Sequence, residues 1–459
     1  MEVIIREIKT SLSAFDRYSL FRSEDVIFLD SAKDPERLGR YSFIGLNPFK
    51  KVTYSNGVVN EDGNITNGDP FVLLNRIMNR YKVDNPTQLP FVGGCMGYMS
   101  YDLGRDLETI PVMTEETVSM PSLYFVFYEN VIVVDHHRNQ VYITELYRMS
   151  VGSTNLDEIE VTISQGRCNP MGRLEFRSVK PLAPFGQEAY MAAVERMRQF
   201  IRTGDIYIAN MTQTYVAETD RQGFDIYKIL RHINPAPFAA YLPLEGFEII
   251  CSSPERFIQV RKGKVTTRPI KGTRPRGSTP EEDEANKRAL EESEKDKSEL
   301  LMVVDLERND LSKVCRPYTV KVTELFEIES YATVHHLVST VEGKLREDQT
   351  AIDCMKACFP GGSITGTPKI RAMEVIETLE VTRRNIYTGC VGYFGFDGGA
   401  DFNIVIRTIL KKDNQAYIGL GGGITWESDP EEEYKEILDK GEALFRALGT
   451  KEIADAATD

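Results

Sequence analysis

A short hairpin near the middle of the chain constrains the fold more than any other segment. Two strand-forming runs, 256–261 and 265–268, flank Lys262-Gly263-Lys264, where glycine can supply the positive φ of a tight turn. With Gly263 at the centre of the turn, Lys271 falls opposite Glu255. Directly opposed residues of antiparallel strands hold their Cβ atoms about 4.5–5.5 Å apart. The sequence therefore predicts antiparallel strands that bring an amine and a carboxyl group to one place.

This pairing of Lys271 with Glu255 has two interpretations. It is either a structural salt bridge between strands or a catalytic pair in which the lysine amine is a nucleophile. Both depend on the strand register, because a slip of one residue moves a side chain to the opposite face of the sheet. The hairpin segment alone leaves the two interpretations open.

Composition excludes several classes of protein. The chain has 459 residues, enough for a large core, and its formal net charge of −14 argues against general nucleic-acid binding. Its seven cysteines have no paired C-x-x-C spacing, which indicates reduced thiols rather than a disulfide framework or a zinc site. The charged N-terminus fits no secretory signal. The most apolar stretch, Leu123 to Val134, is too short to span a membrane and predicts two buried strands. We expect a soluble, cytoplasmic protein without a membrane or nucleic-acid partner.

The pattern of elements divides the chain into two regions joined by a connection. Residues 1–165 contain mainly short alternating strands with a few helices. Residues 166–187 are polar and rich in glycine and proline, as is typical of a connection. Residues 188–459 mix strands with longer helices and hold the motifs that carry chemistry. A helix is expected over Glu188 to Thr203, because its apolar residues recur at helical spacing.

Two expected helices of the later region each carry an acidic pair at i, i+3. The first runs from Thr279 to Glu299 and includes Asp296, and the second includes Glu433 and Glu436. Like charges on one helix face repel unless the face is solvated or a cation lies between them. Ligands that are all oxygen suit magnesium rather than zinc. Each pair is therefore either a solvated face or part of a magnesium site, and sequence spacing cannot bring the two helices together.

Two glycine-rich segments offer backbone amides to an anion. The loop 359–369 leads into a helix expected to begin near Thr367. It is not a phosphate-binding loop, because Pro368 stands where a lysine should follow the last glycine. Gly421-Gly422-Gly423 follows an expected strand over residues 416–420 and is either a plain turn or a second source of amides.

Taken together, these motifs resemble the chorismate-utilising enzymes nearly from end to end. The resemblance implies an α+β fold, a large two-part arrangement of mixed and antiparallel sheets with flanking helices. Lysine at position 271 and the loop 361–366 are similar to the aminodeoxychorismate synthases of this family, whereas its anthranilate synthases have alanine at that position. The segments that carry the resemblance are residues 29–31, 39–45, 253–257, 269–277, 304–310, 335–339, 359–369, 405–408 and 433–440.

The resemblance implies that ammonia aminates chorismate to 4-amino-4-deoxychorismate, on the route to 4-aminobenzoate and folate. Lys271 would be the nucleophile, and Glu255 the general acid for the leaving hydroxyl. Mg²⁺ would bind Glu299 and Glu436 directly, with Asp296 and Glu433 holding its waters. His336 could equally be a hydrogen-bonded core histidine. The residues implied in substrate binding are Arg407, Lys440, Gly422, Gly423, Thr365, His336, Tyr393, Gly272 and Thr273.

Ammonia needs a source, because the sequence lacks the nucleophilic cysteine with downstream His and Glu of a glutamine amidotransferase. The resemblance implies a cytoplasmic heterodimer with a separate glutamine amidotransferase subunit. Ile208 departs from the family, where glutamine is usual. An anthranilate synthase component I and a catalytically silent regulatory relative remain alternatives. The resemblance also implies a possible tryptophan pocket at Asp30, Ser31, Tyr41, Pro237 and Phe238.

Overall fold

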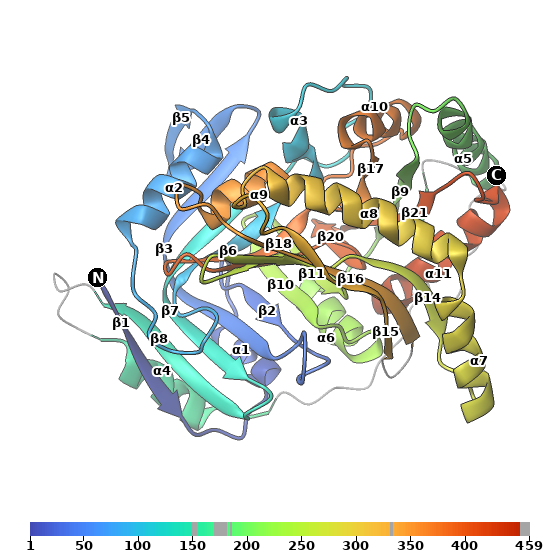
Figure 1. Cartoon of the computed structure of the whole chain (residues 1–459). Helices are drawn as coiled ribbons and strands as arrows, with labels where there is room; N and C mark the ends of the chain where they lie inside the picture. Colours follow the sequence, from blue (N-terminus) through green and yellow to red (C-terminus); the bar gives the residue numbers. More distant parts are fainter. Residues whose placement is uncertain (148–153, 169–180, 184–185, 331–333, 450–459) are drawn as a thin grey trace.

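Strands from the whole length of the chain join in one hydrogen-bonded sheet system flanked by helices (Figure 1). This computed structural model describes residues 1–147, 154–168, 181–183, 186–330 and 334–449. Neighbouring strands pair in the antiparallel sense, as in the β3–β7 and β9–β21 pairs. The α+β fold expected from the sequence is confirmed. In the part of the chain that the structure describes, no helix is both long and apolar enough to cross a membrane.

The N-terminal region supplies the long strands at the centre of the sheet. Its elements are β1 (Glu2–Ile8), α1 (Ala14–Phe21), β2 (Phe28–Asp30), β3 (Tyr41–Ser55), β4 (Val58–Glu61), β5 (Asn64–Asn67), α2 (Pro70–Arg80), β6 (Gly94–Met99), η1 (Tyr101–Leu103), α3 (Gly104–Leu107), β7 (Leu123–Asp135), β8 (Gln140–Tyr147) and α4 (Leu156–Gln165). The predicted pair of strands over residues 123–134 is instead the single strand β7, which pairs with β6 by its first half and with β8 by its second.

The later region begins with a helix that starts one residue before its predicted position. Its elements are α5 (Gln187–Arg202), β9 (Ile208–Glu218), α6 (Gly223–Ile233), β10 (Phe238–Leu244), β11 (Phe247–Ser253), β12 (Arg256–Arg261), β13 (Lys264–Thr267), β14 (Ile270–Pro275), α7 (Pro280–Glu291), α8 (Glu294–Ser312), β15 (Lys321–Ser330), β16 (Val334–Lys344), α9 (Ala351–Cys358), η2 (Gly362–Ile364), β17 (Gly366–Thr367), α10 (Lys369–Leu379), β18 (Cys390–Gly395), β19 (Ala400–Asn403), β20 (Thr408–Lys412), β21 (Gln415–Ile424) and α11 (Pro430–Leu448).

Strands of the two regions pair directly with each other. Leu29 of β2 faces Ala240 of β10, and Gly97 of β6 faces Gly392 of β18. The division at residues 166–187 therefore separates the chain along its sequence but not across the sheet. Residues 169–180 and 184–185 of the expected connection lie outside the described residues.

The central hairpin forms, but its predicted register is wrong by one residue. Lys262-Gly263 alone makes the turn, and both residues have positive φ, 51° and 75°. Such a two-residue turn matches the twist of the strands it joins. The chain then leaves β13 for β14, where Lys271 pairs with Leu337 of β16 rather than with Glu255.

The predicted helix over residues 279–299 is two helices, because Ser293 caps a second one. The Ser293 hydroxyl accepts a hydrogen bond from the backbone N–H of Asp296, so α8 starts afresh after α7. Figure 1 shows α8 running across the sheet while α7 projects from its end. Thr279 caps α7 and Asp429 caps α11, as the Thr-Pro and Asp-Pro pairs indicate.

The glycine-rich segments also differ from the sequence-based expectation. Gly421-Gly422-Gly423 is neither a turn nor the end of a strand, because all three residues pair with β9 inside β21. The helix after the glycine-rich loop begins at Lys369, since Gly366–Thr367 first forms the short strand β17.

Candidate active site

The amine of Lys271 lies against the glycine segment of β21. An ideal Cβ atom on Gly423 would lie 3.1 Å from Lys271 Nζ, 3.7 Å from Ile208 Cδ1 and 3.9 Å from Glu299 Oε2. Side chains of β14, β9 and α8 therefore converge on one stretch of backbone. Glycine permits this approach because it has no side chain of its own.

A backbone irregularity at Gly272 lies directly after Lys271 in β14. The pairing of β14 with β16 shifts between Lys271 and Thr273, and Gly272 between them has a φ of +72°. A Cβ atom on Gly272 would lie 2.8 Å from Asp296 Cγ, so both the conformation and the space require glycine. Gly272, predicted to bind substrate, thus shapes the strand that carries Lys271. Thr273 Oγ1 lies 2.9 Å from His336 Nδ1.

Glu255 is the buried acid of the site. It lies just before β12, is 7% exposed and accepts a 2.6 Å hydrogen bond from the Ser363 hydroxyl. Burial raises the pKa of Glu255 to about 7, although Ser363 and the positive charge of Lys271 oppose the shift. Its carboxyl group can therefore donate and accept protons near neutral pH. Glu255 and Lys271 interact electrostatically even though their strands do not pair. Sequence analysis missed Ser363 as a partner, although it lies in the glycine-rich loop.

The neighbouring glycine brings the second acidic helix to the same place. An ideal Cβ atom on Gly422 would lie 3.0 Å from Glu433 Oε2, 3.7 Å from Lys440 Nζ and 4.0 Å from Glu436 Oε1. Glu299 of α8 lies beside Gly423, so the acidic pairs of α8 and α11 meet at adjacent residues of β21. The fold thus brings to one strand two helices that sequence spacing could not place together.

Two of these carboxylates form ion pairs with basic side chains. Glu436 Oε1 lies 2.6 Å from Lys440 Nζ, and Asp296 Oδ2 lies 2.9 Å from Arg274 Nη2. Burial raises the pKa of Glu299, and nearby lysines oppose that shift. For Glu436, burial acts in the same direction, but Lys440 outweighs it and the pKa is lowered. Across the described ranges, no three His, Cys, Asp or Glu side chains are arranged to hold a metal ion.

Glu433 nevertheless leaves one acceptor unsatisfied. Its Oε1 atom accepts a 2.6 Å hydrogen bond from the Ser428 hydroxyl, while its buried Oε2 atom has no hydrogen-bond partner among the described residues. Burial raises the pKa of Glu433. An unpaired buried oxygen is costly, and a hard cation with oxygen ligands would satisfy it. The chemistry of this donor set therefore fits magnesium.

Arg407 and Lys440 form the cationic end of the site. The Arg407 guanidinium donates a hydrogen bond to the backbone carbonyl of Lys440, and Lys440 Nζ donates to Gly421 O at 3.0 Å. Burial lowers the pKa of Arg407, against the charges of Tyr387 and two acidic residues. Burial also raises the pKa of Tyr387 to about 12, with Glu255 acting in the same direction. Tyr387 is therefore a phenol donor near both Arg407 and Glu255, and no sequence motif singled it out.

Two further predicted residues support the site from its edges. Thr365 is buried, and its hydroxyl donates a 2.8 Å hydrogen bond to Gly361 O, which fixes the glycine-rich loop. Burial lowers the pKa of His336 to about 4, assisted by the charges of Lys33 and Arg407. His336 is therefore a neutral imidazole near neutral pH.

Tyr393 lies elsewhere than predicted. It lines a second pocket, where its ring centroid is 4.3 Å from that of Phe91. Tyr387 is instead the tyrosine that interacts electrostatically with Arg407 and Glu255. The two tyrosines are six residues apart, and sequence alone gave no strand register to separate them.

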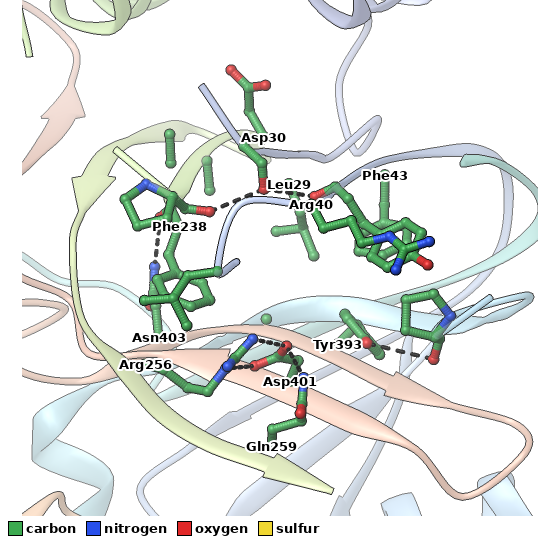
Figure 2. Close-up of a pocket in the computed structure, with 18 of the residues that line it drawn as sticks. Leu29, Asp30, Arg40, Phe43, Phe238, Arg256, Gln259, Tyr393, Asp401 and Asn403 are labelled. Carbon is green, nitrogen blue, oxygen red and sulfur yellow. Dashed lines mark hydrogen bonds and ion pairs between the residues drawn. The ribbon is translucent and has the colours of Figure 1, made fainter. Parts of the chain in front are cut away.

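The second pocket has a volume of about 310 Å³ (Figure 2). Figure 2 shows the Asp30 carboxylate pointing away from the pocket; it lies 2.5 Å from Arg231 Nε. The Arg256–Asp401 ion pair, at 2.9 Å, lies on the opposite wall. The pocket is large enough for a small molecule. All five residues predicted for a tryptophan pocket line it: Asp30, Ser31, Tyr41, Pro237 and Phe238.

A buried acid, an amine and a set of carboxylates thus surround the glycine backbone of β21 and form the candidate active site. The chain belongs to the family of chorismate binding enzymes, whose model matches residues 24–446. It is therefore a chorismate-utilising enzyme.

Two relatives are equally similar to the chain. Aminodeoxychorismate synthase component 1 of Bacillus subtilis (strain 168) is 37% identical over 456 residues, covering 96% of this chain and 95% of that protein. Anthranilate synthase component 1 of Acetivibrio thermocellus is 37% identical over 465 residues, covering 97% of this chain and 94% of that protein. The crystal structure of anthranilate synthase component I from Streptococcus pneumoniae TIGR4 matches with a TM-score of 0.81 at 32% identity, and the match covers 89% of this chain and 92% of that protein. Overall identity does not separate the two activities.

Proposed function

We propose that this enzyme converts chorismate and ammonia to 4-amino-4-deoxychorismate and water, the component I reaction of aminodeoxychorismate synthase, on the route to 4-aminobenzoate and folate. The observation that carries the proposal is the Lys271 amine, which lies 3.1 Å from the Cβ position of Gly423 and whose charge acts on Glu255. The similarity to the Bacillus subtilis relative supports it. A nucleophile near a buried acid is the arrangement that covalent catalysis needs.

The first half of the reaction forms a covalent adduct. The attack needs Lys271 as a neutral amine and Glu255 as a carboxylic acid. The amine attacks carbon 2 of the ring, the double bonds shift, and the bond between carbon 4 and its hydroxyl breaks. Glu255 donates its proton to the departing hydroxyl, which leaves as water. The raised pKa of Glu255, about 7, suits this proton transfer.

In the second half of the reaction, ammonia is the nucleophile and Lys271 is the leaving group. Ammonia attacks carbon 4, the double bonds shift back, and the bond between carbon 2 and Lys271 breaks. Lys271 leaves as an amine, and Glu255 accepts the proton that the new ammonium group releases. Ile208 Cδ1 lies 3.7 Å from the Cβ position of Gly423, and this apolar side chain cannot act as a base that activates water.

The substrate carboxylates are held by the surrounding cations. Arg407, Lys440 and the backbone around Gly422 and Gly423 would bind them, with Tyr387 as an additional donor. Glu299 and Glu436 would hold Mg²⁺ directly, with Asp296 and Glu433 holding its waters. Bound there, the ion would withdraw electron density from the ring through its carboxylate.

Ammonia would come from a separate glutamine amidotransferase subunit in a cytoplasmic heterodimer. Free ammonium should replace that subunit in the test tube. Activity with ammonium chloride would therefore test component I chemistry without the partner.

The equal identity to an anthranilate synthase component 1 favours one alternative. Lys271 argues against it, because the anthranilate synthases that the chain resembles have alanine there. The test is to give the purified protein chorismate, Mg²⁺ and ammonium, and to resolve the products by mass and fluorescence. 4-Amino-4-deoxychorismate is expected, and anthranilate as the main product would overturn the proposal.

A further inference from the structure

Lys369 ends the glycine-rich loop with an ammonium group that the proposed mechanism does not use. Its side chain is 10% exposed, and its Nζ atom lies 2.5 Å from Asp310 Oδ2 of α8. The same atom donates hydrogen bonds to the backbone carbonyls of Cys358, at 2.8 Å, and Pro360, at 2.7 Å. A lysine ammonium has three hydrogens, and all three have acceptors here. Lys369 therefore binds its own loop and has no hydrogen left for an anionic ligand.

The loop is bound on both sides of Ser363. Lys369 binds the Pro360 carbonyl, three residues before Ser363, and the Arg384 guanidinium donates to the backbone carbonyl directly after it. Between these two attachments, the Ser363 hydroxyl donates a 2.6 Å hydrogen bond to Glu255 Oε1. The side chain that orients the Glu255 carboxyl group thus comes from a backbone that two cationic side chains fix in place.

The hydrogen bond from Ser363 also acts on the proton of Glu255. Burial raises the pKa of Glu255, and the Ser363 hydroxyl opposes this shift because it stabilises the ionised carboxylate. Loss of this bond would therefore raise that pKa further. The other titratable groups that interact with Glu255 are Lys271 of β14, Glu307 of α8 and Tyr387. A displacement of the loop is therefore measurable in the titration of Glu255.

We propose that Lys369 is a positioning residue for Glu255: it binds the Pro360 carbonyl, so that the loop presents the Ser363 hydroxyl to the acid. The inference rests on the proposed role of Glu255 as general acid. Without Lys369, the loop loses its attachment to Asp310 of α8, and the Ser363 hydroxyl is no longer kept within hydrogen-bond distance of Glu255. Glu255 then keeps its proton to a higher pH and is less well oriented toward the leaving hydroxyl.

The kinetic test follows the pH at which the rate of chorismate consumption declines in Lys369→Met. Methionine removes the three donors but keeps an unbranched side chain. The midpoint of the decline is expected about one pH unit above that of wild type, the effect of one hydrogen bond to a charged group. Lys313→Met is the matched control, because Lys313 also binds Asp310, at 2.9 Å, but donates its other hydrogen bond to Ala357 O, outside the loop. A wild-type midpoint in Lys369→Met would overturn the proposal.

A double variant separates the effect of the loop from a direct effect of charge. A lost positive charge would by itself raise the pKa of Glu255. The Lys369 charge also lowers the pKa of Glu307, so its loss favours neutral Glu307 and cannot raise the Glu255 pKa by that route. If Lys369 acts through the loop, Ser363→Ala raises the midpoint by a similar amount, and adding Lys369→Met shifts it no further. Shifts that add, or no shift in Ser363→Ala, would overturn the proposal.

Infrared difference spectroscopy measures the same titration without turnover. The spectrum of wild type minus that of Glu255→Gln gives the carbonyl stretch of the Glu255 carboxylic acid, which should disappear with a midpoint at a pH of about 7. The same difference in the Lys369→Met background should have its midpoint about one pH unit higher. An unmoved midpoint would overturn the proposal.

Two further arms keep the outcome clear. If Lys369→Met does not fold, Lys369→Gln replaces it, because its amide has two hydrogens for three acceptors and the same upward shift is expected. Anthranilate as product would refute the proposed function, while the infrared midpoint would still test Lys369. An infrared midpoint in Lys369→Gln equal to that of wild type would overturn the proposal.

Discussion

The Nζ atom of Lys271 lies 3.1 Å from the point that a Cβ atom would occupy on Gly423. A methyl group there would press on the end of a flexible side chain and displace the amine. Gly423→Ala should therefore lower kcat/KM for chorismate by about 100-fold, the cost of a misplacement near 1 Å. Gly68→Ala is the matched control, because nothing lies within 4 Å of its Cβ position. Equal rates for the two variants would show that activity does not depend on the position of the Lys271 amine beside Gly423.

The acid role of Glu255 predicts a pH dependence. An acid works in its protonated form, so activity should be highest below the Glu255 pKa of about 7 and decline as the pH rises through it. Glu255→Gln should lower kcat by about 10²–10⁴-fold and leave a residual rate without that decline. A residual rate that declines over the same range would assign the titration to another group. The measurement is kcat against pH at saturating chorismate and ammonium.

The convergence of α8 and α11 predicts how magnesium binds. Glu299→Gln and Glu436→Gln should each weaken magnesium binding by about 10–100-fold, because each removes one anionic ligand. Titration calorimetry measures this affinity directly, without turnover. Glu294→Gln is the control on the same helix, since its side chain is 87% exposed. Full activity of the wild-type enzyme in excess chelator would contradict a metal role.

Local chemistry was predictable from the sequence where it depends on neighbouring residues. The caps at Thr279 and Asp429 follow from side chains that bond to nearby backbone, and the acidic pairs follow from helical spacing. The proximity of Lys271 to Glu255 was predicted from a hairpin register that proved wrong, although the two groups do interact electrostatically. It arises because β14 pairs with β16 and places the amine beside β21.

Long-range arrangement was not predictable in this way. Gly421-Gly422-Gly423 is typical of a turn, yet all three residues pair with β9, and side chains of α8 and α11 approach two of them. Tyr387 and Tyr393 could not be told apart, because their surroundings depend on strands far away in the sequence. Ser293 was the one local signal overlooked, since a serine three residues before Asp296 is a typical start of a helix.

A buried ion pair between Arg384 and Glu380 supports the backbone of β9 and of the glycine-rich loop. Arg384 Nη2 lies 2.7 Å from Glu380 Oε1, and the same guanidinium donates to Ile364 O at 2.8 Å and Asn210 O at 2.6 Å. Glu380→Gln leaves a buried arginine charge without its counterion, so the free energy of unfolding should fall by about 3–5 kcal/mol. Asp305→Asn breaks an exposed pair and should change it by less than about 0.5 kcal/mol. Chemical denaturation measures both, and equal midpoints would contradict the structural role of Glu380.

The most direct test is product analysis of Lys271→Ala beside wild type. Both proteins receive chorismate, Mg²⁺ and ammonium, and native circular dichroism confirms that both are folded. Wild type should form 4-amino-4-deoxychorismate, and Lys271→Ala should form none above background, because the adduct at carbon 2 cannot form. Formation of 4-amino-4-deoxychorismate by Lys271→Ala at the wild-type rate would contradict the covalent role of Lys271.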